Sequence, residues 1–452
     1  MNYTGEYQKK LVKAEEAVKV IQSGDWVDYG TFQNQVVMLD MALAGRKDDL
    51  RDVKIRSACR VSGPPAAAMA DPTNESFTFN SGHYSPIDRK VGDFGMCYYY
   101  PLLFREVPSY YQYATVDVAM VAVTPMNRHG YFNFGPTNVY SKKTCDLAKH
   151  VILEVNPNIP WVMGGNQESI HISEVDYIVE ADWPLMQLPE IPVKYEDEKI
   201  AGLILKEIED GSCIQLGIGA LPNALGRLIA KSDLKDLGVH SEMMCDAFLE
   251  MWEAGRITGM KKNIDQGKMV FTFALGSLRL YDFLDQNPGV ASYPVDYVNY
   301  PHMIAANDKV VSINNALEVD LFGQVAAESS GPRHISGTGG QVDFVEGAYM
   351  SKGGKSFIAL SSTYTDKEGR LQSRISPTLS PGTIVTTTRS TVMYIATEFG
   401  IACMKAKSTW ERAEALIELA HPKFREDLIR EAEKMNIWRK CNKRPTMAQC
   451  VG

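Results

Sequence analysis

A glycine-rich turn offers the first candidate for chemistry. Residues 216–223 read L-G-I-G-A-L-P-N, in which an apolar strand leads into Gly217 and Gly219 and Pro222 begins a helix. Glycines let a backbone turn tightly and approach a ligand, and a helix N-terminus presents unpaired N–H groups. The window predicts a cradle for an anion or oxyanion. An ordinary strand-to-helix turn remains the alternative, because one Gly-x-Gly is a weak signal.

A carboxylate follows in the window 238–246, which reads G-V-H-S-E-M-M-C-D. A short apolar strand ends at Glu242, and a helix follows it. The carboxyl ends of strands border the binding crevice of open α/β sheets, so Glu242 is a candidate catalytic residue. The alternative is a carboxylate that binds backbone amides at the start of the helix. His240 and Cys245 have no triad partner and are interpreted as a structural residue and a small buried apolar residue.

A third window, residues 336–344, reads S-G-T-G-G-Q-V-D-F. Three glycines before an amide side chain indicate either backbone held close to a ligand or a flexible turn. Alone, this window does not decide between the two interpretations.

The absence of several motifs and the overall charge exclude some classes of function. There is no G-x-x-x-x-G-K-[ST] phosphate loop, no H-E-x-x-H metal motif and no G-x-S-x-G elbow, so no metal ligand is predicted. The net charge is −8, without a basic run, which argues against nucleic acid. No window of about eighteen apolar residues predicts a membrane span. The polar start and eight scattered cysteines predict a cytoplasmic protein with reduced thiols.

The elements that position these windows form two halves. Pro184, Pro189 and Pro192 mark an extended crossing, which places a domain boundary between residues 1–190 and 191–452. Each half opens with a helix, a glycine, a strand and a second glycine at the same spacing, which predicts a duplicated entry unit. The matched positions are Ile21, Gly24, Val27 and Gly30 in the first half and Ile208, Gly211, Ile214 and Gly217 in the second. The first-half helix is expected to carry Leu11, Ala14, Val18 and Ile21 on one face.

Near-continuous apolar strands predict parallel sheets. They are residues 116–123, 150–155, 269–273, 309–313 and 357–360. Near the end, Ser408 and Glu411 form a capping box, and Pro422 begins the next helix. The predicted fold is α/β, with two open domains of related plan, mostly parallel sheets and an active site in the cleft between them.

Together the three windows resemble the acetyl-CoA hydrolase/transferase family, in particular its butyryl-CoA:acetate and 4-hydroxybutyrate CoA-transferase branch. The resemblance covers nearly the whole chain. Further matching segments are residues 23–27, 130–136, 154–156, 295–297, 313–315, 412–417, 420–422 and 435–439.

The resemblance implies a role for each window. Glu242 would form a glutamyl-CoA thioester, and Leu317 and Gly340 would lie against CoA. The CoA-binding loop, which also contributes to the oxyanion hole, would consist of Gly217, Ile218, Gly219, Ala220 and Leu221. CoA thioesters, acetate and butyrate are then substrates, no cofactor is bound permanently, and a homo-oligomer is expected. The chain departs from the family at Ala406, where glycine is frequent, which weakens the assignment of Lys405 and Lys407 to CoA phosphates.

The expected reaction moves CoA from butyryl-CoA to acetate by a ping-pong mechanism. One thioester replaces another, so no ATP is needed, and a carboxylate that is ionised near neutral pH needs no general base. The alternatives are 4-hydroxybutyrate or propionate as the acid, an acyl-CoA hydrolase that uses the same glutamate, and a CoA-sensing module without catalysis. Aromatic residues of the first half either wall the acyl pocket or, as favoured, pack in the core. They are Tyr98, Tyr99, Tyr100, Tyr110, Tyr111, Phe132 and Phe134.

Overall fold

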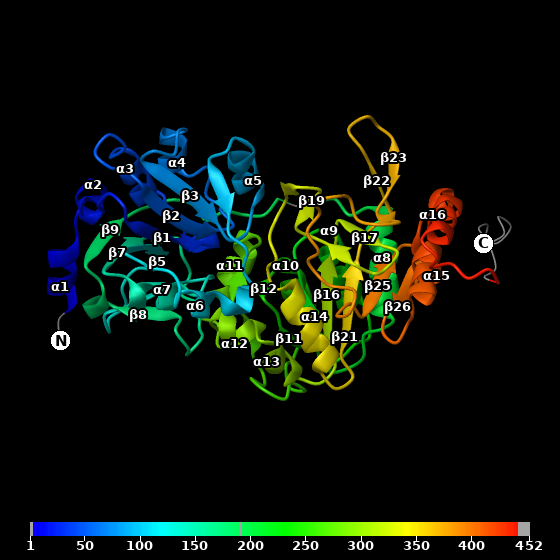
Figure 1. The fold of residues 1–452 in the computed structure, drawn as a ribbon. Helices are drawn as coiled ribbons and strands as arrows, with labels where there is room; N and C mark the ends of the chain where they lie inside the picture. Colours follow the sequence, from blue (N-terminus) through cyan, green and yellow to red (C-terminus); the bar gives the residue numbers. More distant parts are fainter. Residues whose placement is uncertain (1–2, 190, 442–452) are drawn as a thin grey trace.

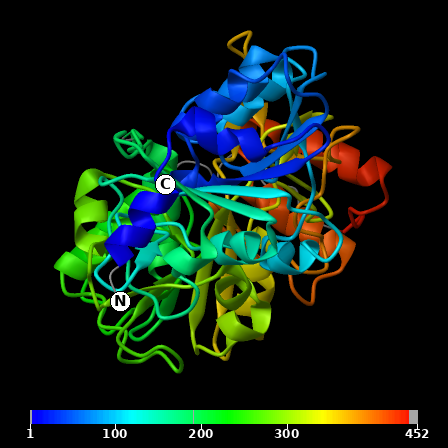
Figure 2. The same ribbon diagram turned by 90° about the vertical axis from the view of Figure 1, so that its left-hand side faces the viewer.

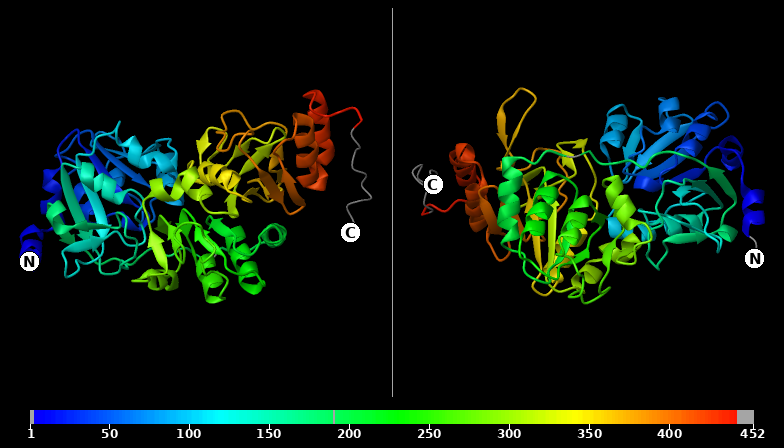
Figure 3. Two further views of the ribbon diagram at one scale, coloured as in Figure 1. Left: turned by 90° about the horizontal axis from the view of Figure 1, so that it is seen from below. Right: turned by 180° about the vertical axis from the view of Figure 1, so that it is seen from behind.

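The computed structural model describes residues 3–189 and 191–441. Figure 1 shows two α/β halves side by side, the N-terminal half in blue to cyan and the C-terminal half in green to red. Seen from below, the yellow elements of the C-terminal half adjoin the blue to cyan half, and the green helices lie below them in the view (Figure 3, left).

The N-terminal half is built on a seven-stranded sheet in the order β4-β3-β2-β1-β5-β7-β9, and every neighbouring pair is parallel. Its strands are β1 (Trp26–Thr31), β2 (Val53–Ala58), β3 (Phe77–Ser81), β4 (Cys97–Tyr99), β5 (Val118–Val123), β7 (His150–Val155) and β9 (Tyr177–Glu180). A separate hairpin pairs β6 (Tyr131–Asn133) with β8 (Ser169–His171). The α-helices are α1 (Tyr3–Lys10), α2 (Ala14–Ala17), α3 (Met38–Ala44), α4 (Ala66–Ala70), α5 (Pro86–Asp93), α6 (Val107–Tyr110) and α7 (Ser141–Leu147), and short 3₁₀ turns are η1 (Val18–Val20), η2 (Phe32–Asn34), η3 (Phe104–Glu106) and η4 (Ile172–Glu174).

The C-terminal half is built on an eight-stranded sheet in the order β15-β13-β11-β10-β16-β21-β25-β26, in which only the last pair is antiparallel. Its strands are β10 (Cys213–Leu216), β11 (Gly238–His240), β13 (Met269–Phe271), β15 (Val290–Ser292), β16 (Val310–Asn315), β21 (Lys355–Ala359), β25 (Tyr394–Thr397) and β26 (Gly400–Cys403). The α-helices are α8 (Tyr195–Leu205), α9 (Ala220–Lys231), α10 (Asp246–Glu253), α11 (Leu278–Leu284), α12 (Val295–Asn299), α13 (Pro301–Ala305), α14 (Gln341–Met350), α15 (Thr409–Leu419) and α16 (Pro422–Lys434).

Smaller sheets complete the C-terminal half. They pair β12 (Met243–Met244) with β14 (Phe273–Ala274), β17 (Glu318–Asp320) with β18 (Val325–Ala326) and β24 (Ile375–Ser376), β19 (Ser329–Ser330) with β20 (Arg333–His334), and β22 (Thr363–Thr365) with β23 (Leu371–Ser373). The predicted strand 269–273 is therefore two strands, because the chain leaves the large sheet after β13 and pairs with β12 instead.

Both large sheets follow one plan. In each, the first strand along the chain lies in the middle, the next three strands extend to one side, and the following strands extend to the other. β1 and its neighbours β2 and β5 thus correspond to β10 with β11 and β16. The prediction of two open α/β domains of related plan is confirmed.

The first predicted helix is interrupted. Leu11 forms a β-bridge with Ile178, and the Val12 amide donates to the Ile178 carbonyl, so the chain is extended between α1 and α2. Ala14, Val18 and Ile21 are nevertheless buried. The apolar spacing therefore predicted the buried face correctly and the continuity of the helix wrongly.

The proline-marked segment forms no helix or strand in the described residues from 181 to 194. Seen from behind, it runs across the molecule from the N-terminal half to α8 (Figure 3, right). The domain boundary between residues 190 and 191 falls in this segment and stays a prediction. Viewed from the N-terminal half, the blue helices near the N-terminus lie towards the left of the molecule and the orange and red helices lie at its right (Figure 2).

Two expectations near the C-terminus are matched. The capping box of Ser408 and Glu411 begins α15, and Pro422 begins α16.

No helix in the described parts of the chain is long and apolar enough to cross a membrane.

Candidate active site

Glu242 lies between β11 and β12, where the strands of the C-terminal sheet end. The Ser241 hydroxyl donates to the carbonyls of Leu216 (3.3 Å) and Met243 (2.8 Å), and the Glu242 carbonyl accepts the Thr272 amide (3.0 Å). The backbone on both sides of the glutamate is therefore fixed to neighbouring strands.

The carboxylate of Glu242 is bound by an amide side chain. Asn299 Nδ2, at the end of α12, donates to Glu242 Oε2 at 2.6 Å and also to Asp343 Oδ2 at 3.1 Å. Among the described residues no backbone N–H donates to this carboxylate, and α10 begins only at Asp246. Glu242 therefore does not act as a carboxylate that caps a helix.

The pKa of Glu242 is raised to about 8, mainly by burial; the charge of Asp343 also raises it, and the hydrogen bond from Asn299 lowers it. This differs from the expectation that the carboxylate is fully ionised near neutral pH. The sequence could not indicate the desolvation, which arises only when the two halves enclose the side chain.

A network of polar and charged side chains connects Glu242 in the C-terminal half with Arg105 in the N-terminal half. Arg105 in η3 donates from Nη1 to Asp343 Oδ1 (2.7 Å) and to Glu346 Oε2 (3.1 Å), and its backbone amide donates to Asp343 Oδ2 (3.3 Å). Asp343 lies in the first turn of α14 and is fully buried. Arg105, Asp343, Asn299 and Glu242 thus form one polar chain.

Glu242 faces a cavity of about 180 Å³ between the halves. The N-terminal wall comprises Phe32, Ala58, Cys59, Gly82, His83 and Phe104. The C-terminal wall comprises Gln215, Leu216, Gly217, Ile218, Met243, Phe273, Leu275, Asn314, Gly339, Gly340, Gln341 and Phe344. The rings of Phe32 and Phe273 stack across the boundary with centroids 3.8 Å apart. The site therefore lies in the predicted cleft.

The glycines of the 336–344 window lie against the carboxylate. A Cβ added to Gly340 would lie 1.9 Å from Glu242 Oε2 and 2.5 Å from Asn299 Nδ2. Gly339 has a left-handed φ of 53°, which also favours glycine. Of the two interpretations of this window, close backbone approach is the one that the geometry supports.

The glycine turn after β10 is divided between two hollows. Gly217 and Ile218 line the cavity with Glu242, whereas Ala220, Leu221 and Leu317 line a separate hollow of about 180 Å³. Gly219 lies between these two groups of residues in the chain, immediately before α9, and has a φ of 133°. Arg374 also lines the second hollow and donates to the Leu317 carbonyl at 2.9 Å. The predicted CoA-binding residues therefore line two separate hollows, apart from Gly219, which lies between the two groups in the chain.

The two neighbours of Glu242 are buried as interpreted. His240 Nε2 lies 2.8 Å from the Val298 carbonyl, and burial lowers its pKa to about 3. Burial raises the pKa of the Cys245 thiol to about 12, which keeps it protonated. Neither is suited to be the nucleophile.

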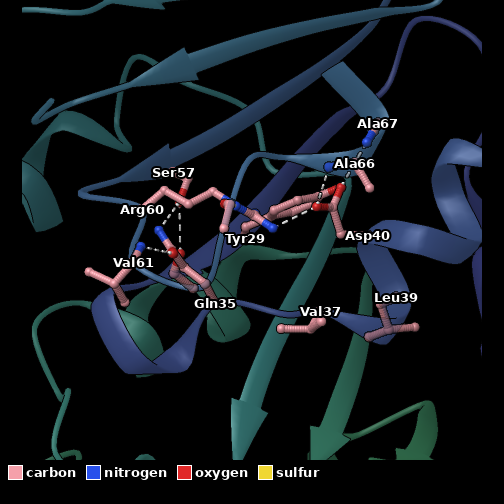
Figure 4. A network of polar contacts seen from close by, with 12 residues as sticks. Tyr29, Gln35, Val37, Leu39, Asp40, Ser57, Arg60, Val61, Ala66 and Ala67 are labelled. Carbon is pink, nitrogen blue, oxygen red and sulfur yellow. Dashed lines mark hydrogen bonds and ion pairs between the residues drawn. The ribbon is translucent and has the colours of Figure 1, made fainter. Parts of the chain in front are cut away.

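A polar network fixes the N-terminal wall (Figure 4). Asp40 accepts hydrogen bonds from Arg60 Nη2 (2.7 Å), Tyr29 Oη (3.0 Å) and the amides of Ala66 and Ala67. Gln35 then ties the loop after β2: its Nε2 donates to the Ala58 carbonyl at 3.0 Å, and its Oε1 accepts the Val61 amide at 3.1 Å. The loop that carries Ala58 and Cys59 into the cavity is held from both sides.

Sequence reasoning missed several residues of this site. Asn299, Arg105 and His83 belong to windows without a recognisable pattern, and Asp343 lay in the glycine window without a role. None of the seven aromatic residues considered for the acyl pocket lines the cavity; Phe32, Phe104, Phe273 and Phe344 do. Phe132 and Phe134 are fully buried in the core, as the favoured interpretation had it.

Comparison with known proteins identifies the family. Residues 1–188 match the acetyl-CoA hydrolase/transferase N-terminal domain, and residues 276–432 match the corresponding C-terminal domain. The chain belongs to the acetyl-CoA hydrolase/transferase family, which confirms the resemblance.

Two relatives match this chain over nearly its whole length. The butyryl-CoA:acetate CoA-transferase of Anaerostipes caccae is 50% identical over 98% of this chain and 100% of its own. A probable butyrate:acetyl-CoA coenzyme A-transferase of Syntrophomonas wolfei is 52% identical over 97% of this chain and 98% of its own.

Solved structures are similar in fold to nearly the whole chain. RipA from Yersinia pestis has a TM-score of 0.89 at 38% identity, over 97% of this chain and 100% of its own. The 4-hydroxybutyrate CoA-transferase of Porphyromonas gingivalis has a TM-score of 0.78 at 33% identity, over 96% and 100% of the two chains.

Proposed function

We propose that this protein transfers CoA between a short-chain acyl-CoA and a free carboxylic acid, with butyryl-CoA and acetate as the substrate pair. A thioester on Glu242 is the intermediate. The observation that carries the proposal is a desolvated carboxylate in an apolar cavity between the halves, held by Asn299 and touched by the Gly340 backbone. Full-length similarity to proteins named for this reaction supports the substrate class.

The contacts of Glu242 assign its two oxygens different tasks. Asn299 holds Oε2, which leaves Oε1 to attack the acyl-CoA carbonyl carbon. A C–O bond forms and the C–S bond breaks, giving a mixed anhydride and a CoA thiolate. The thiolate then attacks the glutamyl carbon, the first acid leaves as its carboxylate, and CoA stays on Glu242. A second carboxylate reverses both steps.

Two groups of donors would stabilise the oxyanions. Asn299 Nδ2 remains bound to the Glu242 oxygen that becomes an oxyanion when the glutamyl carbon is attacked. Backbone N–H groups of the loop from Gly217 to Leu221, at the N-terminus of α9, are suited to the acyl oxyanion. Preorganised donors of this kind typically contribute about 3 kcal/mol each.

The cavity also accounts for selectivity. Its aromatic walls and small volume favour a short acyl chain and limit water, which would hydrolyse the anhydride or thioester. The second hollow, lined by Ala220, Leu221 and Leu317, would receive part of the CoA arm.

The decisive experiment traps the intermediate. Enzyme incubated with butyryl-CoA alone is treated with borohydride, which reduces thioesters and leaves carboxylates, and peptides are then mapped by mass. We expect lost activity and a reduced residue in segment 241–246, with Glu242→Gln unmodified. Modification at Cys245, or full transfer by Glu242→Gln, would disprove the mechanism. Thiol release that does not depend on acetate would instead indicate a hydrolase.

A further inference from the structure

One polar side chain of the cavity has no task in the proposed mechanism. His83 follows β3 in the N-terminal half and lines the cavity opposite the glycine window. Its backbone is fixed, because its carbonyl accepts the Cys59 amide (2.7 Å) and the Ser81 hydroxyl (2.9 Å). The next amide, that of Tyr84, donates to the Ser336 carbonyl at 2.8 Å. The chain therefore holds this imidazole against the other half of the molecule.

The imidazole lies beside the reacting carboxylate. A Cβ built on Gly339 would lie 3.5 Å from His83 Cε1 and 4.0 Å from Glu242 Oε1, so the two side chains flank one backbone position. A Cβ on Gly337 would lie 2.9 Å from His83 Nδ1. The absence of side chains on both glycines leaves room for the ring.

The ring nitrogens of His83 form no hydrogen bond within residues 3–189 and 191–441. Other histidines near the interior differ: His240 Nε2 meets the Val298 carbonyl, and His334 Nε2 meets the Ser336 carbonyl, each at 2.8 Å. The His83 side chain is only partly buried and lines the cavity, so its unpartnered ring nitrogens are available to bind a ligand there.

The protonation state of His83 and the residues around it indicate which kind of ligand it would bind. The pKa of His83 is lowered to about 4, mainly by burial and also by the nearby His334, so the ring is neutral and offers one N–H donor and one acceptor. The opposite wall adds Gln215, which is 3% exposed and whose Nε2 is also without a partner among the described residues. Two neutral donors between aromatic walls suit a carboxylate, which has only acceptors.

We propose that His83 donates its imidazole N–H to a carboxylate oxygen of the exchanging acid and, with Gln215, forms the acid-binding subsite of this cavity. The proposal rests on the proposed CoA transfer. When acetate attacks the Glu242 thioester, one acetate oxygen forms the new C–O bond. His83 holds the other oxygen, which becomes the carbonyl oxygen of the anhydride, while the electron pair of the broken C–S bond leaves on the CoA thiolate. The imidazole keeps its proton throughout.

The test separates acid binding from CoA binding. Acetate has no remote group to hold it, whereas the CoA arm anchors butyryl-CoA outside this cavity. His83→Ala should raise the KM for acetate about 10- to 100-fold, the typical loss for a hydrogen bond to a charged group, and change the KM for butyryl-CoA less than about twofold. His83→Gln, which restores an N–H donor, should recover most of the loss.

A comparator distinguishes function from packing. His334 stacks on Tyr99 at 3.7 Å and is bonded to the Ser336 carbonyl, so His334→Gln should lower thermal stability without a selective effect on acetate. His83→Met, which keeps side-chain bulk without a donor, replaces His83→Ala if the alanine variant does not fold, and the same rise in acetate KM is expected.

The experiment distinguishes failure of the acid-binding subsite from failure of the proposed CoA transfer. Wild-type enzyme that consumes no butyryl-CoA on addition of acetate refutes the CoA transfer itself. Active wild-type enzyme with an unchanged acetate KM in a folded donor-free variant overturns the subsite alone. Equal losses in His83→Ala and His83→Gln would overturn it too, because the donor would then be irrelevant.

Discussion

In the proposed mechanism Glu242 must lose its proton before it attacks, and its pKa is raised to about 8. The ionised fraction therefore grows as the pH rises from 6 to 9. We expect kcat/KM for butyryl-CoA, which reports the free enzyme, to increase with pH and level off above about 8. His83, with its pKa lowered to about 4, does not titrate in this range. A flat profile between pH 6 and 9 would contradict the assignment.

Two neighbours should move this inflection in opposite directions. The Asp343 charge raises the pKa of Glu242, so Asp343→Asn should shift the inflection to lower pH. The Asn299 hydrogen bond lowers that pKa, so Asn299→Ala should shift it to higher pH and also reduce kcat about 10- to 100-fold. The pH profiles of both variants measure the shifts; displacement in the same direction would be inconsistent with the observed contacts.

The sequence indicates the proposed nucleophile but not the residues that surround it. Glu242 is recognisable because it follows an apolar strand and precedes a helix, a pattern contained within nine residues. Asn299 and His83 lie far from Glu242 in the chain and reach it only because separate elements converge at one cavity. No local spacing encodes such contacts. The family resemblance supplied a role for Glu242 but none for these two residues.

The turn before α14 is sensitive to added bulk beside Glu242. A methyl group on Gly340 would overlap Glu242 Oε2, at 1.9 Å, and would displace the carboxylate. Gly340→Ala should reduce kcat at least about 100-fold, since displacements of about 1 Å at a reacting group have effects of this size. Gly202→Ala, in α8 with nothing within 4 Å, is the matched control and should keep full activity. Steady-state rates, with circular dichroism to verify folding, make the comparison.

The loop after β26 carries a strained alanine. Ala406 has a φ of 58°, a left-handed conformation that disfavours residues with a Cβ. Ala406→Gly should stabilise the protein by about 0.5–1 kcal/mol, because the relief of strain exceeds the entropy lost by glycine on folding. A higher thermal midpoint would show it; Ala70→Gly, in the last turn of α4, should have the reverse effect. A lower midpoint for Ala406→Gly would mean that neighbouring contacts already offset the strain.

At this scale, apolar runs predicted the strands well and helix continuity less well. Residues 150–155 form β7 with the predicted bounds, because residues 151–155 are buried in the parallel sheet and four of these five are apolar. The first helix breaks at Leu11, because its backbone pairs with Ile178. That partner is distant in the chain, so side-chain periodicity near Leu11 contains no trace of it.

The whole molecule repeats one arrangement of strands, and the candidate site lies between the two copies. The shared spacing of the two entry units predicted this relation, since β1 and β10 occupy the same central position in their sheets. The contacts that join the halves, such as the stacking of Phe32 on Phe273, required the structure. The expected homo-oligomer stays a prediction.

The ion pair between Arg105 and Asp343 should couple the stability of the two halves. Asp343 is fully buried, and Arg105 is its only cationic partner in the described residues. Arg105→Gln would leave a buried carboxylate without a cation, which typically destabilises a protein by about 3–5 kcal/mol. The deficit should be smaller at pH 6 than at pH 8. Burial already raises the pKa of Asp343 to about 6, and loss of Arg105 raises it further, so protonation relieves the unpaired charge as the pH falls.

A double-mutant cycle isolates this coupling. Asp343→Asn removes the charge while keeping the side-chain volume, so Arg105→Gln combined with Asp343→Asn should be more stable than Arg105→Gln alone. Unfolding midpoints of the four proteins at pH 6 and pH 8 should give a coupling free energy of at least about 1 kcal/mol. Arg105 also contacts Glu346, so Glu346→Gln serves as the control for a half-exposed partner and should change stability by less than about 1 kcal/mol. If the two substitutions are additive at both pH values, the ion pair contributes no coupling. The two halves would then be joined by their other contacts, such as the stacking of Phe32 on Phe273 and the hydrogen bond from the Tyr84 amide to the Ser336 carbonyl.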